Sequence, residues 1–188
     1  IAMVELCQKE NRGVNCRMLA QMLTEVYLAM GFKARFVTCM PRDYVSDCHV
    51  ITTVYSNTLN KWLWVDPTHE AYVMDENGVM LSIAEVRERL RNDQPLQLNE
   101  DANWNNRQKT YKEYYLDRYM AKNLYYLICM DYARFDAETV KEGRTYRYIA
   151  LMPYDEINSQ TNSIGWSILR VSDDEWFWQS PYLTKLII

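Results

Sequence analysis

The residues best able to do chemistry in this 188-residue chain begin with a cysteine near the N-terminus. Cys16 directly follows Asn15, a residue type favoured at the N-cap of a helix. A thiol at that position faces unpaired backbone N–H groups and the positive end of the helix dipole, which together stabilise a thiolate. Cys16 is therefore a candidate nucleophile, although a free cysteine is more often a small buried hydrophobe.

A histidine and an aspartate follow at positions that could serve this thiol. His49 begins a run rich in β-forming residues, and Asp66 ends the next such run. In a hairpin, the start of one strand lies beside the end of the other, so the two side chains can meet. Histidine is the natural general base for a thiol, and a carboxylate can orient the imidazole. Taken singly, His49 could be a structural histidine and Asp66 a turn residue before proline. The ordered trio predicts a catalytic triad.

Other residues offer weaker alternatives. His69 could act as a second base, but its position in a loop after a proline predicts exposure to solvent. Cys48, His49, Asp66 and His69 could also form a zinc site, yet their spacing fits no recognised ligand pattern. Cys48 should point to the opposite face of the strand from His49 and lie in the core. None of the five cysteines forms a C-x-x-C pair, and a disulfide framework is not expected.

The elements that must position these residues follow from periodicity. Apolar residues recur at helical spacing from Asn15 to Met30, and Gly31 suits the end of that helix. Three strands are expected after it, at Ala34–Met40, Cys48–Tyr55 and Lys61–Val65. A helix followed by mostly antiparallel strands predicts an α+β fold.

Further elements are expected in the rest of the chain. Ser82 and Glu85 form a capping box that opens a helix to about Leu90. The remaining expectations are a hairpin over 71–81, a solvated loop over 92–107, a helix over 108–120 and strands over 124–130, 146–152, 164–171 and 176–179. We therefore expect a core over residues 1–104 and a β-rich extension over 105–188 that packs on the same core.

The motifs together resemble a known family. They are Gly13-Val14-Asn15-Cys16 at a helix start, the segment 30–35 (MGFKAR), Cys48-His49, and the segment 62–68 (WLWVDPT). This order is similar to that of the transglutaminase-like superfamily, which has a papain-like cysteine-enzyme core. By position, the resemblance implies that Cys16 is the nucleophile, His49 the base and Asp66 the orienting acid. It covers about residues 11–70. Val50 and Ile51 depart from the alanine and aromatic residue that often follow the family's histidine.

The resemblance also implies an activity. It is a thiol-dependent acyl transfer, with a cysteine peptidase or amidase that hydrolyses peptide or isopeptide bonds as the first expectation. A protein cross-linking transglutaminase and a non-catalytic domain that binds peptide or glycan are the alternatives. No metal or organic cofactor is expected, and the partner would be a peptide or protein substrate. The Cys16 backbone N–H is a natural oxyanion donor, and Gln8 and Asn11 are the upstream amide side chains. By family resemblance alone, an extracytoplasmic location is implied.

Composition excludes other classes of function. The chain is 48% hydrophobic and 24% charged, which is typical of a globular protein. Its net charge is −4, and no basic stripe with interleaved aromatic residues is present, so nucleic-acid binding is not expected as its main role. The longest purely apolar run, Leu124–Met130, falls far short of the roughly 20 residues that span a bilayer.

Overall fold

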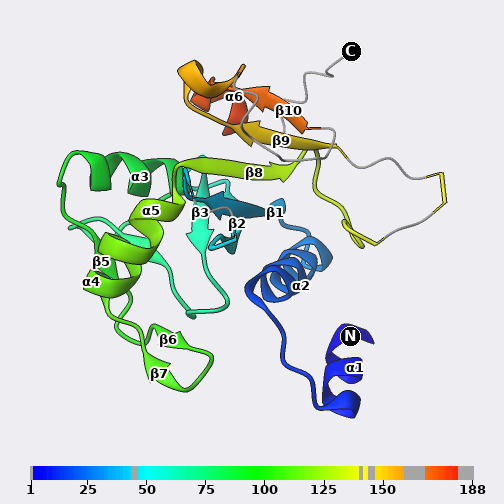
Figure 1. The fold of residues 1–188 in the computed structure, drawn as a ribbon. Helices are drawn as coiled ribbons and strands as arrows, with labels where there is room; N and C mark the ends of the chain where they lie inside the picture. The colour runs from blue at the N-terminus through cyan, green and yellow to red at the C-terminus, as the bar shows by residue number, and fades with distance from the viewer. Residues whose placement is uncertain (1, 44–45, 140–141, 144–146, 159–167, 182–188) are drawn as a thin grey trace.

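The computed structural model describes residues 2–43, 46–139, 142–143, 147–158 and 168–181. Its main feature is a six-stranded sheet in the order β10-β9-β8-β1-β2-β3 (Figure 1). All neighbouring strands are antiparallel except β9 and β10, which run parallel. The six strands are β1 (Ala34–Met40), β2 (His49–Ser56), β3 (Lys61–Val65), β8 (Tyr126–Met130), β9 (Tyr148–Leu151) and β10 (Ile168–Val171). Helices and a large, mainly antiparallel sheet confirm the predicted α+β class.

Helices and short elements complete the fold. The helical segments are α1 (Ala2–Glu10), α2 (Cys16–Ala29), α3 (Ile83–Arg91), α4 (Lys112–Tyr114), the π-helical η1 (Tyr115–Met120), α5 (Ala121–Asn123), the 3₁₀ turn η2 (Tyr154–Glu156) and α6 (Asp174–Phe177). Two small ribbons pair β4 (Val73–Met74) with β5 (Gln97–Leu98) and β6 (Asn103–Trp104) with β7 (Gln108–Lys109). Among the described residues, no helix is long and apolar enough to cross a membrane.

The helix that carries Cys16 begins and ends as its sequence predicts. The Asn15 side chain accepts a hydrogen bond from the Met18 backbone N–H at 2.9 Å, and Gly31 adopts a φ of +87° just after the helix. The helix lies against β1 and β2, where the Thr52 hydroxyl donates to the Ala20 carbonyl at 2.9 Å. The caps thus fix the helix start, and Cys16 is its first residue.

The two faces of the sheet are covered by different elements. Ala20 of α2 packs with Phe36, Met40 and Val50 in one cluster, and that cluster lies on the α2 face. The opposite face holds a second cluster that includes Cys39 and Ile51 of the sheet and Val86 of α3 together with Tyr115 and Leu116 of η1. The two clusters alternate along β1 and β2 because successive side chains point to opposite faces. Register places His49 opposite Cys39, so His49 belongs to the second face.

The second half of the chain continues the same sheet. Strand β8 pairs with β1, with Val37 opposite Cys129, so the sheet joins the two halves at its centre. The strands predicted at 124–130 and 146–152 are confirmed as β8 and β9, and residue 146 lies outside the described residues. The strand predicted over 164–171 is present at Ile168–Val171, and its first part lies outside the described residues.

Several local predictions can be compared with the structure. The capping box is present, because Ser82 accepts from the Glu85 N–H and the Glu85 carboxylate accepts from the Ser82 N–H. The hairpin expected over 71–81 is reduced to a bridge between Met74 and Met80, while β4 pairs with β5. The expected loop over 92–107 contains β5 and β6. The helix predicted over 108–120 is confirmed over 112–120, where α4 continues directly into the π-helical η1, while residues 108–109 form β7.

The strand predicted over 176–179 is wrong, because α6 lies at this position. The Asp173 side chain accepts from the Trp176 backbone N–H at 3.0 Å and so caps the first turn of α6. An N-cap therefore decides the local structure where aromatic content favours a strand.

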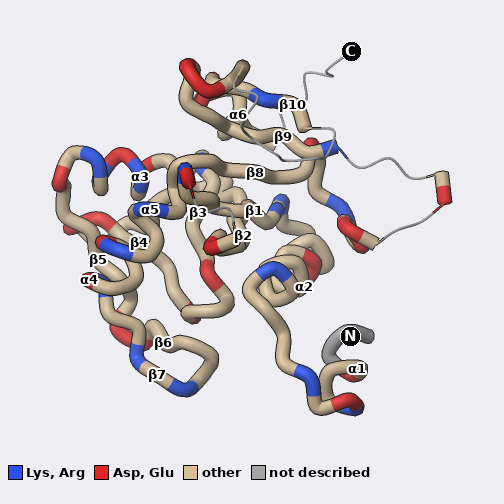
Figure 2. The backbone as a smooth tube through the Cα atoms, viewed as in Figure 1, with Lys and Arg blue, Asp and Glu red and all other residues tan. Residues whose placement is uncertain are grey.

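Charged residues are mixed in sign. In α3, acidic and basic residues follow one another from Glu85 to Arg91, and Figure 2 shows both signs along it. This arrangement is that of a solvated helix face and agrees with the absence of a basic stripe in the sequence.

Candidate functional site

The thiol of Cys16 lies half-buried at the first residue of α2. Burial acts to raise its pKa, but a hydrogen bond and the charge of His49 lower it, as do the backbone N–H groups of Val50 and Arg17. The net pKa is below that of an ordinary cysteine. Because the thiolate is the reactive form of cysteine, this environment favours a nucleophile at neutral pH.

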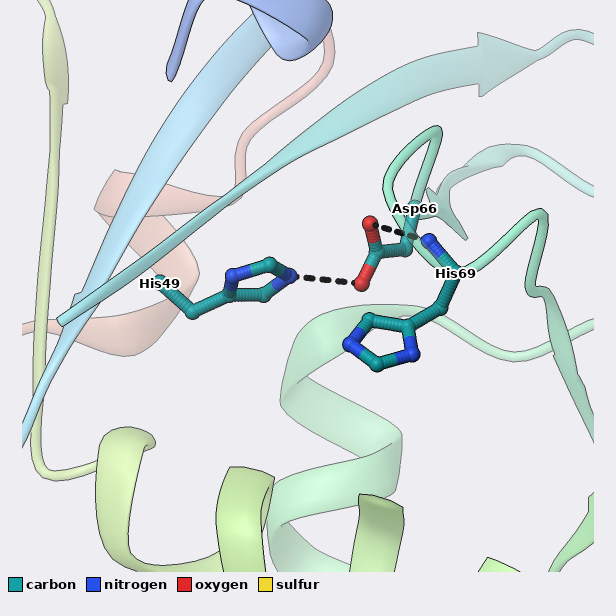
Figure 3. A group of neighbouring side chains, drawn as sticks. All are labelled: His49, Asp66 and His69. Carbon is teal, nitrogen blue, oxygen red and sulfur yellow. Dashed lines mark hydrogen bonds and ion pairs between the residues drawn. The ribbon is translucent and has the colours of Figure 1, made fainter. Parts of the chain in front are cut away.

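His49 and Asp66 meet as the hairpin geometry predicts. The His49 Nε2 lies 2.7 Å from the Asp66 Oδ2 (Figure 3), and both side chains are almost fully buried. A carboxylate only accepts hydrogen bonds, so Nε2 is the donor and Nδ1 is left as the nitrogen available to Cys16. Burial lowers the pKa of His49, but the charge and hydrogen bond of Asp66, followed by those of Cys16, raise it to about 10. The Asp66 carboxylate and the Cys16 thiol therefore both favour the charged form of the imidazole.

Four hydrogen bonds hold the Asp66 carboxylate. Its Oδ2 accepts from His49 and from the Tyr115 hydroxyl at 2.5 Å, while its Oδ1 accepts from the backbone N–H groups of Thr68 at 2.8 Å and His69 at 3.3 Å. Complete burial acts to raise the pKa of Asp66, but the charge and hydrogen bond of His49, with His69 and Tyr115, lower it. The carboxylate stays ionised and fixed in position.

Tyr115 is a site residue that the sequence does not reveal. Its ring is fully buried in the core, and its hydroxyl also accepts from the Trp64 indole N–H at 3.3 Å. Tyr115 lies 49 positions beyond Asp66, in a segment whose helical periodicity is weak. No motif connects the two residues, so only the fold brings them together.

His69 is buried, which corrects the expectation of solvent exposure. Only 8% of its surface is exposed, because η1 covers the loop after Pro67 and the Tyr115 ring lies 4.4 Å from the His69 ring. The His69 Nδ1 lies 3.0 Å from the Thr110 hydroxyl. Burial lowers the pKa of His69, and the charge of His49 adds to this against the opposing effect of Asp66. A lowered pKa favours the neutral imidazole of His69, which packs against Tyr115 and contacts Thr110.

A metal site at these residues does not fit the hydrogen bonding. One ligand atom each of His49, Asp66 and His69 lies within 4.8 Å of the others (Figure 3), and Cys48 is not in this group. Both carboxylate oxygens of Asp66, however, already accept two hydrogen bonds each. A cation would have to displace His49 or Tyr115 to reach Oδ2, and a backbone N–H group to reach Oδ1.

Cys48 lies just before β2 on the face opposite to His49, as strand alternation predicts. It is half-buried rather than fully in the core, and it packs against the same cluster as Cys16. Burial, with the charge of Cys16 as the next contribution, raises the pKa of Cys48. Of these two neighbouring cysteines, only Cys16 has a lowered pKa.

A cavity of about 570 Å³ opens directly onto the site. Cys16, His49 and His69 contribute to its wall. Aromatic side chains from the β6–β7 ribbon and from the segment that follows it make up half of the remaining lining residues, namely Trp104, Tyr111, Tyr114 and Tyr119. Gln8 and Asn11, the two amide side chains upstream of Cys16, do not line this cavity. A substrate carbonyl placed here would meet the thiol and aromatic rings.

Fold and site together define a class. A cysteine of lowered pKa at a helix N-terminus, beside a buried histidine–carboxylate pair on an antiparallel sheet, is the arrangement of a thiol-dependent enzyme fold. The comparison with protein families agrees with this class. Residues 2–67 match the transglutaminase-like superfamily, which confirms the resemblance seen in the sequence. A search of curated proteins and a search of solved structures each found no match.

Proposed function

We propose that this protein is a thiol-dependent acyl-transfer enzyme that hydrolyses peptide or isopeptide amide bonds, with Cys16 as nucleophile, His49 as acid–base and Asp66 as orienting acid. The observation that carries the proposal is the 2.7 Å contact between His49 and the buried Asp66, beside a thiol whose pKa His49 lowers. The superfamily match over residues 2–67 includes all three residues and supports the same conclusion.

The proposed reaction begins from the thiolate–imidazolium pair. The Cys16 thiolate attacks the amide carbonyl carbon, a carbon–sulfur bond forms, and the carbonyl electron pair moves to oxygen. Protonated His49 then gives its proton to the leaving amine as the tetrahedral intermediate collapses to a thioester. Water, deprotonated by His49, attacks the thioester and releases the acid and the thiol. Asp66 holds the imidazole by Nε2 throughout, which leaves Nδ1 directed to the reacting groups.

The organisation of the chain supports one catalytic unit. We take residues 1–104 as a cysteine-enzyme core, in which the helix that carries Cys16 packs on the antiparallel sheet, and residues 105–188 as an extension. The pairing of β8 with β1 and the contact of Tyr115 with Asp66 support an extension that is part of the same body.

The proposal can be tested by mass spectrometry on a mixture of casein peptides, with the wild-type protein and Cys16→Ala compared. Hydrolysis predicts new peptide ends that require Cys16, and a short incubation predicts an acyl adduct on Cys16. A fluorescent primary amine in the same mixture separates the alternatives, because a cross-linking enzyme would attach the amine to glutamine side chains. Equal peptide maps for the two proteins, with no adduct, would favour a non-catalytic binding domain and contradict the proposal.

A further inference from the structure

A tetrahedral intermediate at Cys16 needs hydrogen-bond donors for its oxyanion. The backbone N–H of Cys16 supplies one, and enzymes of this chemistry usually place a second donor nearby, worth about 10²- to 10³-fold in rate. The upstream amides Gln8 and Asn11 lie outside the cavity that Cys16 faces. The second donor must therefore be sought among the side chains of the cavity wall.

Tyr119 lies on the wall of this cavity and close to the site. Its ring meets the His49 ring edge to face, with 5.4 Å between the centroids, and Tyr119 lines the cavity together with Cys16. Half of the Tyr119 side chain is buried. It belongs to η1, the same short π-helix whose Tyr115 donates to Asp66. The single π-helix η1 thus places two tyrosines at the site, and π-helical turns are frequent at functional sites.

The surroundings of Tyr119 suit a hydrogen-bond donor. Burial, and next the negative charge of the Cys16 thiolate, raise the pKa of Tyr119, so its hydroxyl keeps its proton at neutral pH. The Lys122 ammonium lies 4.8 Å from the Tyr119 ring centroid, and the Tyr114 ring stacks in parallel at 6.4 Å. These contacts hold the phenol ring in place at the wall of the cavity.

Other donors in the wall are less well placed, because Gln108 and Lys109 are exposed and the Thr68 hydroxyl oxygen is fully buried. The Thr110 hydroxyl is engaged with His69. Trp104, Tyr111 and Tyr114 are 42%, 59% and 62% exposed, whereas Tyr119 is half-buried against the His49 ring. Tyr119 is thus the cavity tyrosine that approaches the histidine of the site.

We propose that the Tyr119 hydroxyl donates the second hydrogen bond to the oxyanion that forms when Cys16 attacks a carbonyl, and this inference rests on the proposed acyl-transfer function. In that step the sulfur electron pair forms the carbon–sulfur bond and the carbonyl π pair moves to oxygen. Tyr119 keeps its proton and donates a hydrogen bond to this oxygen. When the intermediate collapses, the carbonyl re-forms and the leaving group departs with the electron pair of its broken bond.

Two reactions of the same thiolate separate this role from others. p-Nitrophenyl acetate acylates Cys16 through an oxyanion and releases p-nitrophenolate, whereas iodoacetamide alkylates the same sulfur by direct displacement without an oxyanion. Tyr119→Phe should lower the acylation rate by about 10²- to 10³-fold and leave alkylation of Cys16 within about twofold of wild type. Tyr154→Phe is the control, because it removes the hydroxyl of a tyrosine that is 85% exposed in η2 and does not line this cavity, and it should change neither rate.

The outcomes are distinguishable. Unchanged acylation in Tyr119→Phe overturns the inference, and so does an equal loss in both reactions, which would assign the hydroxyl to the thiolate or to the folding of the site. Normal alkylation in the variant shows that the site is intact. If the wild-type protein is acylated no faster than Cys16→Ala, the proposed function itself fails, and the role of Tyr119 falls with it.

Discussion

The charge of His49 should control the reactivity of Cys16. Replacing His49 by glutamine removes the charge but keeps an amide donor that can reach Asp66. A cysteine with the ordinary pKa of 9.0 is only about 0.3% thiolate at pH 6.5. Complete ionisation in the wild-type protein would therefore raise the thiolate population by at most about 300-fold over the variant. A thiolate of lower pKa is also a weaker nucleophile, which offsets part of this gain. We expect the wild-type rate to exceed that of His49→Gln by about 10- to 100-fold.

The assay is alkylation by iodoacetamide at pH 6.5, followed by mass spectrometry of the peptide that contains Cys16. Cys48 serves as an internal reference, because burial raises its pKa and it should react slowly in both proteins. His69→Gln is the matched control, since it replaces the other histidine of the cluster, and the Cys16 rate should stay within about threefold of wild type. Equal rates for wild type and His49→Gln at pH 6.5 would refute the coupling between the thiol and the imidazole.

Three further predictions concern the parts that hold the site. Tyr115→Phe removes a hydrogen bond to the buried Asp66 carboxylate, so the free energy of unfolding measured in urea should fall by about 1.5–3 kcal/mol. A fall of less than about 0.5 kcal/mol would contradict this prediction. His49 has a raised pKa, so the stabilisation of wild type over His49→Gln should be complete below about pH 6.5 and disappear as the pH rises through about 10; a difference that grows over this range would contradict the shift. Ser82→Ala removes the N-cap of α3 and should cost about 1 kcal/mol while Cys16 alkylation stays unchanged.

The sequence predicts the elements whose signals are local. The bounds of the helix that begins at Cys16 can be predicted from the sequence, because Asn15 caps its start and Gly31 follows its end. Both signals act within a few residues. The contact between His49 and Asp66 can be predicted for a similar reason, because a hairpin fixes which strand ends lie side by side. Where the local signals compete, as in the aromatic segment that becomes α6, the pattern misleads.

The parts of the site that escape prediction are those set by long-range packing. Tyr115 and Tyr119 reach the His49–Asp66 pair from η1, and their sequence shows no period that would predict a π-helix. His69 is buried for the same reason, because its cover comes from Tyr115 and Thr110, more than forty positions along the chain. A loop can be assigned from its sequence, but its exposure depends on what packs over it.

The placement of Cys16 and His49 explains why the site needs both halves of the chain. His49 points to the sheet face opposite the one that α2 covers, so thiol and imidazole can meet only where the helix begins and β2 begins. On that second face the imidazole and its carboxylate would be open to water without a cover, and water weakens charge pairing. The covering residues come from η1, which follows residue 105. The second half of the chain therefore extends the sheet and also excludes water from the pair that tunes the thiol.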